Sequence, residues 1–170
     1  LFEIAMELPQ DEDTRRWASL ALRRIRDSVR IQVYEDGSQW EQSPMYHNEV
    51  FHCLCCVVYL ARANGIRLDP GLEETVHRMA LADVIWRKPD GCQFIQGDSD
   101  EVDLRDKITM GAWLFRDPVL KYAGFDRMDF EGAWDFGRKA SLEYRSLPAE
   151  KPGFTSACLK DSGNYYLRES

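Results

Sequence analysis

The residue types best suited to chemistry in this sequence gather between Asp36 and His47, in the string DGSQWEQSPMYH. Tyr46 follows a Ser-Pro pair typical of a helix start, which places its phenol in the first helical turn. Because the helix dipole favours negative charge there, we expect it to ease ionisation of a phenol whose ordinary pKa is about 10. Such a tyrosine is suited to donate or accept a proton. Simple packing at a helix start is the alternative.

Three neighbours of Tyr46 are candidate substrate contacts. Glu41 lies on the approach to the helix, and His47 follows Tyr46 about 100° further round it. Trp40 offers a platform on which a sugar ring can stack, as does Phe94 in a later loop. Structural packing of both aromatic rings, and capping by His47, are the alternatives.

A second polar stretch, GDSDEVDLRD, precedes a predicted helix over residues 103–116. Asp98 and Asp100 are candidate substrate contacts, although acidic residues also gather at helix starts on dipole grounds alone. Arg105 is a candidate for binding an anionic substrate, or it pairs with Asp98 or Asp100. The Asp-x-Asp spacing lacks the next oxygen ligand and the turn glycine of a calcium loop, so we expect no calcium there.

No metal or organic cofactor is expected. The three histidines are not four residues apart from one another, and Cys53-x-x-Cys56 has no second pair to complete a zinc site. Three of the five cysteines, Cys53, Cys55 and Cys56, lie in one apolar helical run rather than in loops. This predicts free thiols and favours a cytoplasmic location, with a periplasmic or secreted one left open.

Charge and length exclude several classes of protein. The 170 residues carry 22 basic against 29 acidic side chains, a net charge of −7 that disfavours nucleic-acid binding. No apolar run is long enough to cross a membrane, and no signal segment opens the chain. Because the sequence begins at Leu1 within a helical pattern, we expect a piece of a longer protein whose exposed apolar surface promotes self-association.

Hydrophobic periodicity predicts an all-α fold of antiparallel helical hairpins, with helices over 12–33, 44–63, 71–86, 103–116 and 129–145. Short connections make consecutive helices antiparallel. The loops 34–43 and 87–102, and the segment from 146 onward, should therefore lie at one end of the helical layer. After Pro148, residues such as Gly153 and Tyr165 indicate strands and turns.

The string DGSQWEQSPMYHNEV, a later PDG and then GDSDEVDLRD resemble the heparinase II/III family of polysaccharide lyases. The resemblance implies that residues 1–147 form part of an (α/α) toroid. It also implies that 148–170 form a linker and the first strand of a β-sandwich. It implies β-elimination on an acidic polysaccharide, with Tyr46 as the catalytic tyrosine. The family's other catalytic groups, an upstream Asn or His and a His of the sandwich, have no matching position here.

Two other functions stay open. A glycoside hydrolase on the same helical fold would use Glu41 with Asp98 or Asp100, two carboxylates across a cleft. A non-catalytic helical module would bind glycans or another protein without needing the Tyr46 hydroxyl. Because the family's partner residues are absent from this stretch, we expect residues 1–170 alone to show no elimination activity.

Overall fold

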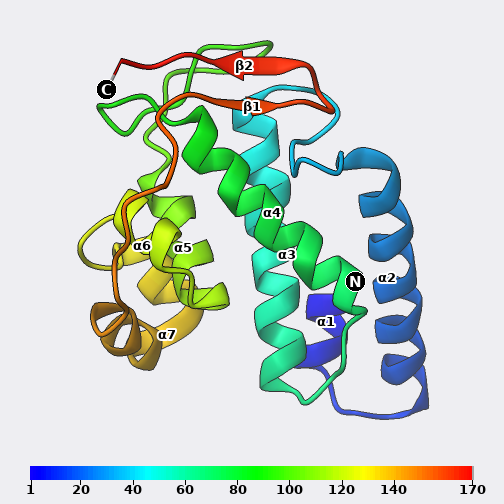
Figure 1. Ribbon diagram of the computed structural model, residues 1–170. Helices are drawn as coiled ribbons and strands as arrows, with labels where there is room; N and C mark the ends of the chain where they lie inside the picture. Colours follow the sequence, from blue (N-terminus) through cyan, green and yellow to red (C-terminus); the bar gives the residue numbers. More distant parts are fainter. Residues whose placement is uncertain (170) are drawn as a thin grey trace.

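The computed structural model describes residues 1–169; Ser170, the last residue of the expected linker and strand segment, lies outside the described residues. The chain is mostly helical and ends in a short antiparallel hairpin (Figure 1). The helices are α1 (Phe2–Glu7), α2 (Glu12–Gln32), α3 (Pro44–Ala63), α4 (Pro70–Trp86), α5 (Arg105–Phe115), α6 (Pro118–Ala123) and α7 (Phe130–Arg145). The all-α prediction with a C-terminal β segment is confirmed.

Helix starts in this chain are marked by local sequence. Asp11 caps α2 through a capping box with Thr14, and Asp69 accepts a hydrogen bond from the Gly71 amide at the start of α4. Pro44, Pro70 and Pro118 each occupy a first helical turn, where the missing N–H costs no hydrogen bond. These signals explain why the predicted helices over 12–33, 44–63 and 71–86 are confirmed within about a residue at each end.

The core lies where α3, α4 and α5 pack together at the centre of the molecule (Figure 1). Phe51 and Val58 of α3 are fully buried against Val76 and Met79 of α4, and Ile108 of α5 completes the cluster. Because α3 is enclosed on most sides, its sequence is apolar almost all round rather than on one stripe. No described helix is both long enough and apolar enough to cross a membrane.

The hydrophobic periodicity did not predict α6. Because of this extra helix, the predicted direction of α7 was wrong. The six-residue α6 follows α5 and turns the chain back, so α7 runs parallel to α5 instead of antiparallel. Lys107 near the start of α5 pairs with Glu131 at the start of α7, while Trp113 and Glu143 bond near the two far ends. The segment from 146 onward therefore leaves from the end opposite the loops 34–43 and 87–102.

The C-terminal segment forms two paired strands rather than one first strand. Strands β1 (Ala157–Leu159) and β2 (Asn164–Tyr166) form a hairpin that lies across the loops at one end of α3 and α4 (Figure 1). Phe94 stacks on Tyr166, with ring centroids 5.3 Å apart. Its ring therefore packs within the protein, the alternative to a platform for sugar stacking. Exposed Phe130, Trp134 and Leu142 on α7 leave self-association a prediction.

Candidate functional site

The two loops that carry most of the predicted site residues meet at the start of α3. Ser43 donates its hydroxyl hydrogen bond to the carbonyl oxygen of Asp98 at 3.0 Å, and its oxygen lies 2.8 Å from the hydroxyl of Ser99. The Met45 amide also donates to the Ser99 hydroxyl at 3.2 Å. Ser43 occupies the N-cap position, but its side chain joins the loops instead of capping the helix. The prediction that loops 34–43 and 87–102 share one end is confirmed.

Tyr46 lies at this junction with 38% of its surface exposed. Its phenol donates a hydrogen bond to Asp98 Oδ2 at 3.0 Å. That hydrogen bond and the negative charge of Asp98, with a smaller contribution from Glu41, raise the pKa of the Tyr46 phenol above its ordinary 10.0. The expectation that this position would ease ionisation is therefore wrong: the pKa of the phenol is raised, because the Asp98 carboxylate beside it favours the protonated form.

Three further predicted contacts, all in the two loops that meet near Tyr46, are exposed to solvent. Trp40 is 50% exposed, and Glu41 and Asp100 are exposed as well. Glu41 Oε1 accepts a hydrogen bond from Gln39 Nε2 at 3.1 Å, which orders its carboxylate. The Tyr46 phenol, with the Asp98 carboxylate bonded to it and that of Glu41 close by, forms an accessible group suited to sugar hydroxyls.

Arg105 does not pair with Asp98 or Asp100. Its guanidinium bonds Asp103 in a forked geometry, with contacts of 3.0 and 2.6 Å, and lies over the ring of Phe125 at 4.8 Å. The backbone spacing explains this choice, because Asp103 Oδ1 also accepts the Arg105 amide at the helix start. About a third of the Arg105 side chain stays exposed, so only part of its donor set is free for an anion.

His47 is not a substrate contact. Its side chain is fully buried between α3 and α4, where Nε2 bonds the carbonyl oxygen of Met79 and the ring packs edge-on against Trp86. Burial lowers the pKa of His47 to about 3, and it raises the pKa of Asp83, whose Oδ1 lies 3.6 Å away. Burial therefore disfavours the charged form of both groups. The one-residue step from Tyr46 turned His47 inward.

Asp36 opens the string DGSQWEQSPMYH, but no individual role was predicted for it from the sequence. Its Oδ1 accepts hydrogen bonds from the amide and hydroxyl of Ser38, and its Oδ2 accepts from the amides of Asp161 and Ser162 in the hairpin turn. Burial alone would raise its pKa, but these hydrogen bonds outweigh burial and lower it. Asp36 therefore holds the hairpin beside the Tyr46 loops, a contact across 125 residues that no local pattern reveals.

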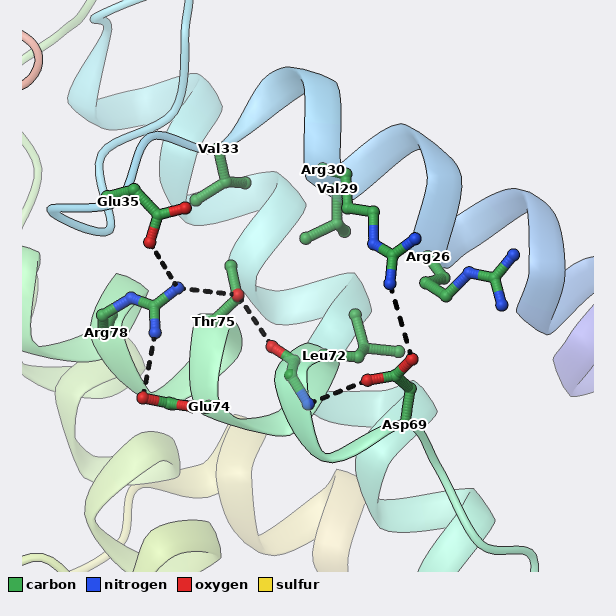
Figure 2. Close-up of a pocket in the computed structure, with 11 residues that line it drawn as sticks. Arg26, Val29, Arg30, Val33, Glu35, Asp69, Leu72, Glu74, Thr75 and Arg78 are labelled. Carbon is green, nitrogen blue, oxygen red and sulfur yellow. Dashed lines mark hydrogen bonds and ion pairs between the residues drawn. The ribbon is translucent and has the colours of Figure 1, made fainter.

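Two cavities are candidate binding sites, one near Tyr46 and one distant from it. A cavity of about 160 Å³ beside the start of α3 is lined by Met45, Asn48, Gln93 and Lys107 among others. A groove of about 360 Å³ between α2 and α4 lies elsewhere (Figure 2). In that groove Arg30 faces Asp69 at 3.7 Å and Arg78 faces Glu74 at 3.2 Å. Its cations are already matched by acids, so we assign it no anion.

Two carboxylates and a thiol in the segment 87–102, called the rim group below, are another possible metal site, but a lysine already occupies it. Asp90, Cys92 and Glu101 offer ligand atoms within 4.8 Å of one another. The Lys88 ammonium, however, ion-pairs with both carboxylates of this group. A metal ion would have to displace that cation, so the rim group carries no metal assignment.

With this geometry established, the chain can be placed among known proteins. Residues 1–122 match the family described as Heparinase II/III N-terminus, and the chain belongs to that family. It is 24% identical, over 96% of its length, to a heparin-sulfate lyase of Pedobacter heparinus. The match covers 23% of that relative, so the chain spans about a quarter of its length.

Solved structures agree on the fold. A mutant of the heparan sulfate lyase HepC from Pedobacter heparinus superposes with a TM-score of 0.75 at 23% identity, over 96% of this chain and 24% of that one. A heparinase III structure gives the same TM-score at 19% identity, with the same coverage. The helices therefore form part of a heparinase-type toroid.

Proposed function

We propose that this chain forms part of a lyase that cleaves uronic-acid-containing polysaccharide by β-elimination, with Tyr46 as its general acid/base. The observation that carries the proposal is the exposed phenol of Tyr46 at the junction of two polar loops, hydrogen-bonded to Asp98 at 3.0 Å. Membership of the heparinase II/III family supports the reaction class. The lyase that it matches in Pedobacter heparinus supports an acidic polysaccharide as the substrate class.

The chemistry asks for a proton donor as well as a base. In β-elimination a base removes the C5 proton of the uronic acid, the electrons form the C4–C5 double bond, and the C4–O bond breaks with a proton delivered to the leaving oxygen. Because Asp98 raises the pKa of Tyr46, the phenol is protonated over the whole neutral range. This favours Tyr46 as the acid that protonates the leaving oxygen.

Tyr46 requires partners for the rest of the reaction. The C5 proton becomes acidic only when the neighbouring carboxylate is neutralised by charge-assisted hydrogen bonds. The family resemblance implies an Asn or His for that task and a His as a further proton carrier, and neither has a place in this chain. We therefore propose that residues 1–170 alone show no elimination activity, and that no metal or organic cofactor takes part in the proton transfers.

The surrounding residues bind substrate in this proposal. Trp40 supplies a face for sugar stacking. Glu41, Asp98 and Asp100 accept hydrogen bonds from sugar hydroxyls. They do not contact the carboxylates of the substrate, because like charges repel. The exposed part of Arg105 attracts the uronate or a sulfate. We further propose that residues 1–147 belong to the toroid and that 148–170 begin the β-sandwich domain.

The test uses the gene product that carries this chain, assayed on a panel of acidic polysaccharides. A lyase produces an unsaturated uronide that absorbs in the near ultraviolet. Tyr46→Phe should lower kcat by about 10²–10⁴-fold with KM little changed, because only the transferable proton is removed. Tyr165→Phe is the matched control, since that tyrosine is 70% exposed on β2 and should keep full activity.

The two other functions give different results in the same assay. New reducing ends without near-ultraviolet absorbance, lost in Glu41→Gln, would indicate a glycoside hydrolase. Full function in Tyr46→Phe would indicate a module that binds without catalysis. Robust elimination by residues 1–170 alone would contradict the proposed need for partners outside this chain.

A further inference from the structure

A histidine, a cysteine and an aspartate come together where α3 faces α7. His52 and Cys56 are four residues apart in α3, so they project from the same face on successive turns. Asp135 of α7 reaches the pair, with its Oδ2 2.7 Å from His52 Nε2. One ligand atom from each residue lies within 4.8 Å of the other two. All three side chains are partly buried, which leaves solvent access to the cluster.

We propose that His52, Cys56 and Asp135 bind a divalent transition-metal ion, with zinc the best match. Imidazole nitrogen, thiolate sulfur and carboxylate oxygen are all ligand types that zinc takes, and three protein ligands with one water complete a tetrahedron. Neighbouring ligand atoms in such a tetrahedron lie about 3.3–3.7 Å apart, given the usual bond lengths. The separations in this cluster, 2.7 Å between His52 and Asp135 and at most 4.8 Å between any two ligand atoms, lie on either side of that spacing. The proposal does not depend on the polysaccharide lyase function.

Lys107 lies next to His52, and zinc binding would break its contact with that histidine. Its Nζ lies 3.5 Å from His52 Nδ1, a contact at the long limit for a hydrogen bond. Zinc at Nε2 leaves the proton on Nδ1, so this contact must be given up. Asp106 at 3.3 Å and Glu131 at 3.2 Å already hold the ammonium and offset its charge. Zinc binding therefore gives up this weak contact and replaces the 2.7 Å hydrogen bond between His52 and Asp135 with two metal–ligand bonds.

Donor chemistry distinguishes this cluster from the other groups of possible ligands among residues 1–169. Asp106, Asp129 and Glu131 offer only carboxylates, and Lys107 already pairs with two of them. The rim group of Asp90, Cys92 and Glu101 encloses Lys88 in the same way. The His52 cluster alone combines nitrogen and sulfur donors, the pair that selects zinc over magnesium or calcium.

A metal ion at this position would join two helices that are distant in sequence. Asp135 lies two residues before Gly137, where φ is +81° and α7 is broken by non-helical backbone. The ion would tie the first part of α7 to α3 and oppose movement at the break. Binding to the folded chain alone would then raise its thermal stability.

The test titrates the 170-residue chain with zinc by calorimetry, and with cobalt as a spectroscopic probe. We expect one ion per chain, a thiolate-to-cobalt charge-transfer band, and a higher Tm in excess zinc. Cys56→Ser should abolish the charge-transfer band and weaken zinc binding at least tenfold. Cys53→Ser is the matched control, because it removes an exposed thiol three residues earlier on α3 and should leave both unchanged.

Asp135→Asn provides a second variant that keeps the shape of the side chain and a hydrogen bond to His52. It should also weaken zinc binding at least tenfold, while circular dichroism and the metal-free Tm show that the chain is folded. Absence of stoichiometric binding to the wild-type chain would overturn the proposal. A charge-transfer band that survives in Cys56→Ser, or that disappears in Cys53→Ser, would overturn it as well.

Discussion

The phenol of Tyr46, in the first turn of α3, and the carboxylate of Asp98, in a loop 52 residues later in the sequence, are joined by a 3.0 Å hydrogen bond. The contact places the proton donor of the proposed reaction beside a negative charge. A neighbouring carboxylate disfavours the phenolate, so the same bond that orients the ring also keeps its proton in place. Position and protonation state of Tyr46 therefore have one common cause.

Asp98→Asn should lower the pKa of Tyr46. The amide oxygen can still accept the phenol hydrogen bond, but the charge that disfavours the phenolate is removed. In the gene product, the alkaline limit of kcat should move to lower pH in parallel, since the proton donor is lost earlier. Tyrosinate absorbance across a pH titration, with Tyr46→Phe subtracted, measures the pKa.

Asp100→Asn is the control for that experiment, because Asp100 is exposed and does not contribute to the raised pKa of Tyr46. An equal shift in Asp100→Asn would show that general surface charge, rather than the Asp98 contact, sets the Tyr46 pKa. An unchanged pKa in Asp98→Asn would contradict the electrostatic argument directly.

Asp36→Asn should loosen the hairpin. The amide NH₂ cannot accept the hydrogen bonds that Oδ2 takes from Asp161 and Ser162, and each hydrogen bond to a charged group contributes about 1.5–3 kcal/mol. Hydrogen exchange at those two amides should accelerate at least tenfold. Asp90→Asn, another turn aspartate that accepts one backbone amide, should leave them unchanged.

Acid should release the same contact in the wild-type chain. The pKa of Asp36 is lowered in the folded state, so its contribution is present above the unfolded pKa, about 3.9, and is lost as the pH falls through the folded value. Exchange protection of Asp161 and Ser162 should therefore persist at pH 5 and fail only below about pH 4. Loss of protection already at neutral pH would contradict the role given to Asp36.

Gly37→Ala should destabilise the chain by about 3 kcal/mol or more, measured by urea unfolding. Its φ is +88°, and an added Cβ would lie 2.3 Å from the carbonyl oxygen of Arg78 in α4. Gly65→Ala is the matched control, because φ is +66° there and no atom lies within 4 Å of the added Cβ. The control should cost only about 1 kcal/mol, the backbone strain alone. Equal losses would rule out the close approach as the cause.

His47→Gln should make the free energy of unfolding depend less steeply on pH below about 6.5. The pKa of His47 is lowered to about 3 by burial, so the unfolded chain binds a proton more readily between pH 6.5 and about 3. Stability conferred by the neutral ring is complete above pH 6.5 and is lost as the pH falls through that window. The free energy of unfolding should therefore fall less steeply with acid in His47→Gln than in the wild-type chain. Identical slopes would show that His47 does not titrate on unfolding.

Much of the fold follows from local patterns. The aspartate and proline signals at helix starts, together with the apolar period, predicted α2, α3 and α4 closely. The same signal, Asp117-Pro118, was present before α6, but six residues are too few for a period to show. Without α6, α7 was predicted to run antiparallel to α5. The extra helix carries the chain back to the end where α5 begins, so α7 runs parallel to it.

The partners of the candidate site could not be predicted in the same way. The sequence predicted Asp98 or Asp100 as an acidic partner of Arg105, but backbone geometry at the start of α5 selected Asp103. His47 looked as accessible as Tyr46, yet the packing of α3 against α4 buried one and exposed the other. Neighbours on a helix differ in direction by about 100°, and sequence alone does not say which direction faces the core.

The amino-acid sequence by itself determined the helical periods, the Ser-Pro start that brings Tyr46 into the first turn of α3, and the string that marks the family. The tertiary structure decided which groups meet: Asp98 with Tyr46, Asp36 with the hairpin, and Asp135 with His52. Helix formation depends on interactions within a few residues, so spacing is sufficient to predict it. Burial, charge partners and pKa depend on segments 50 to 125 residues apart, and only packing brings those together.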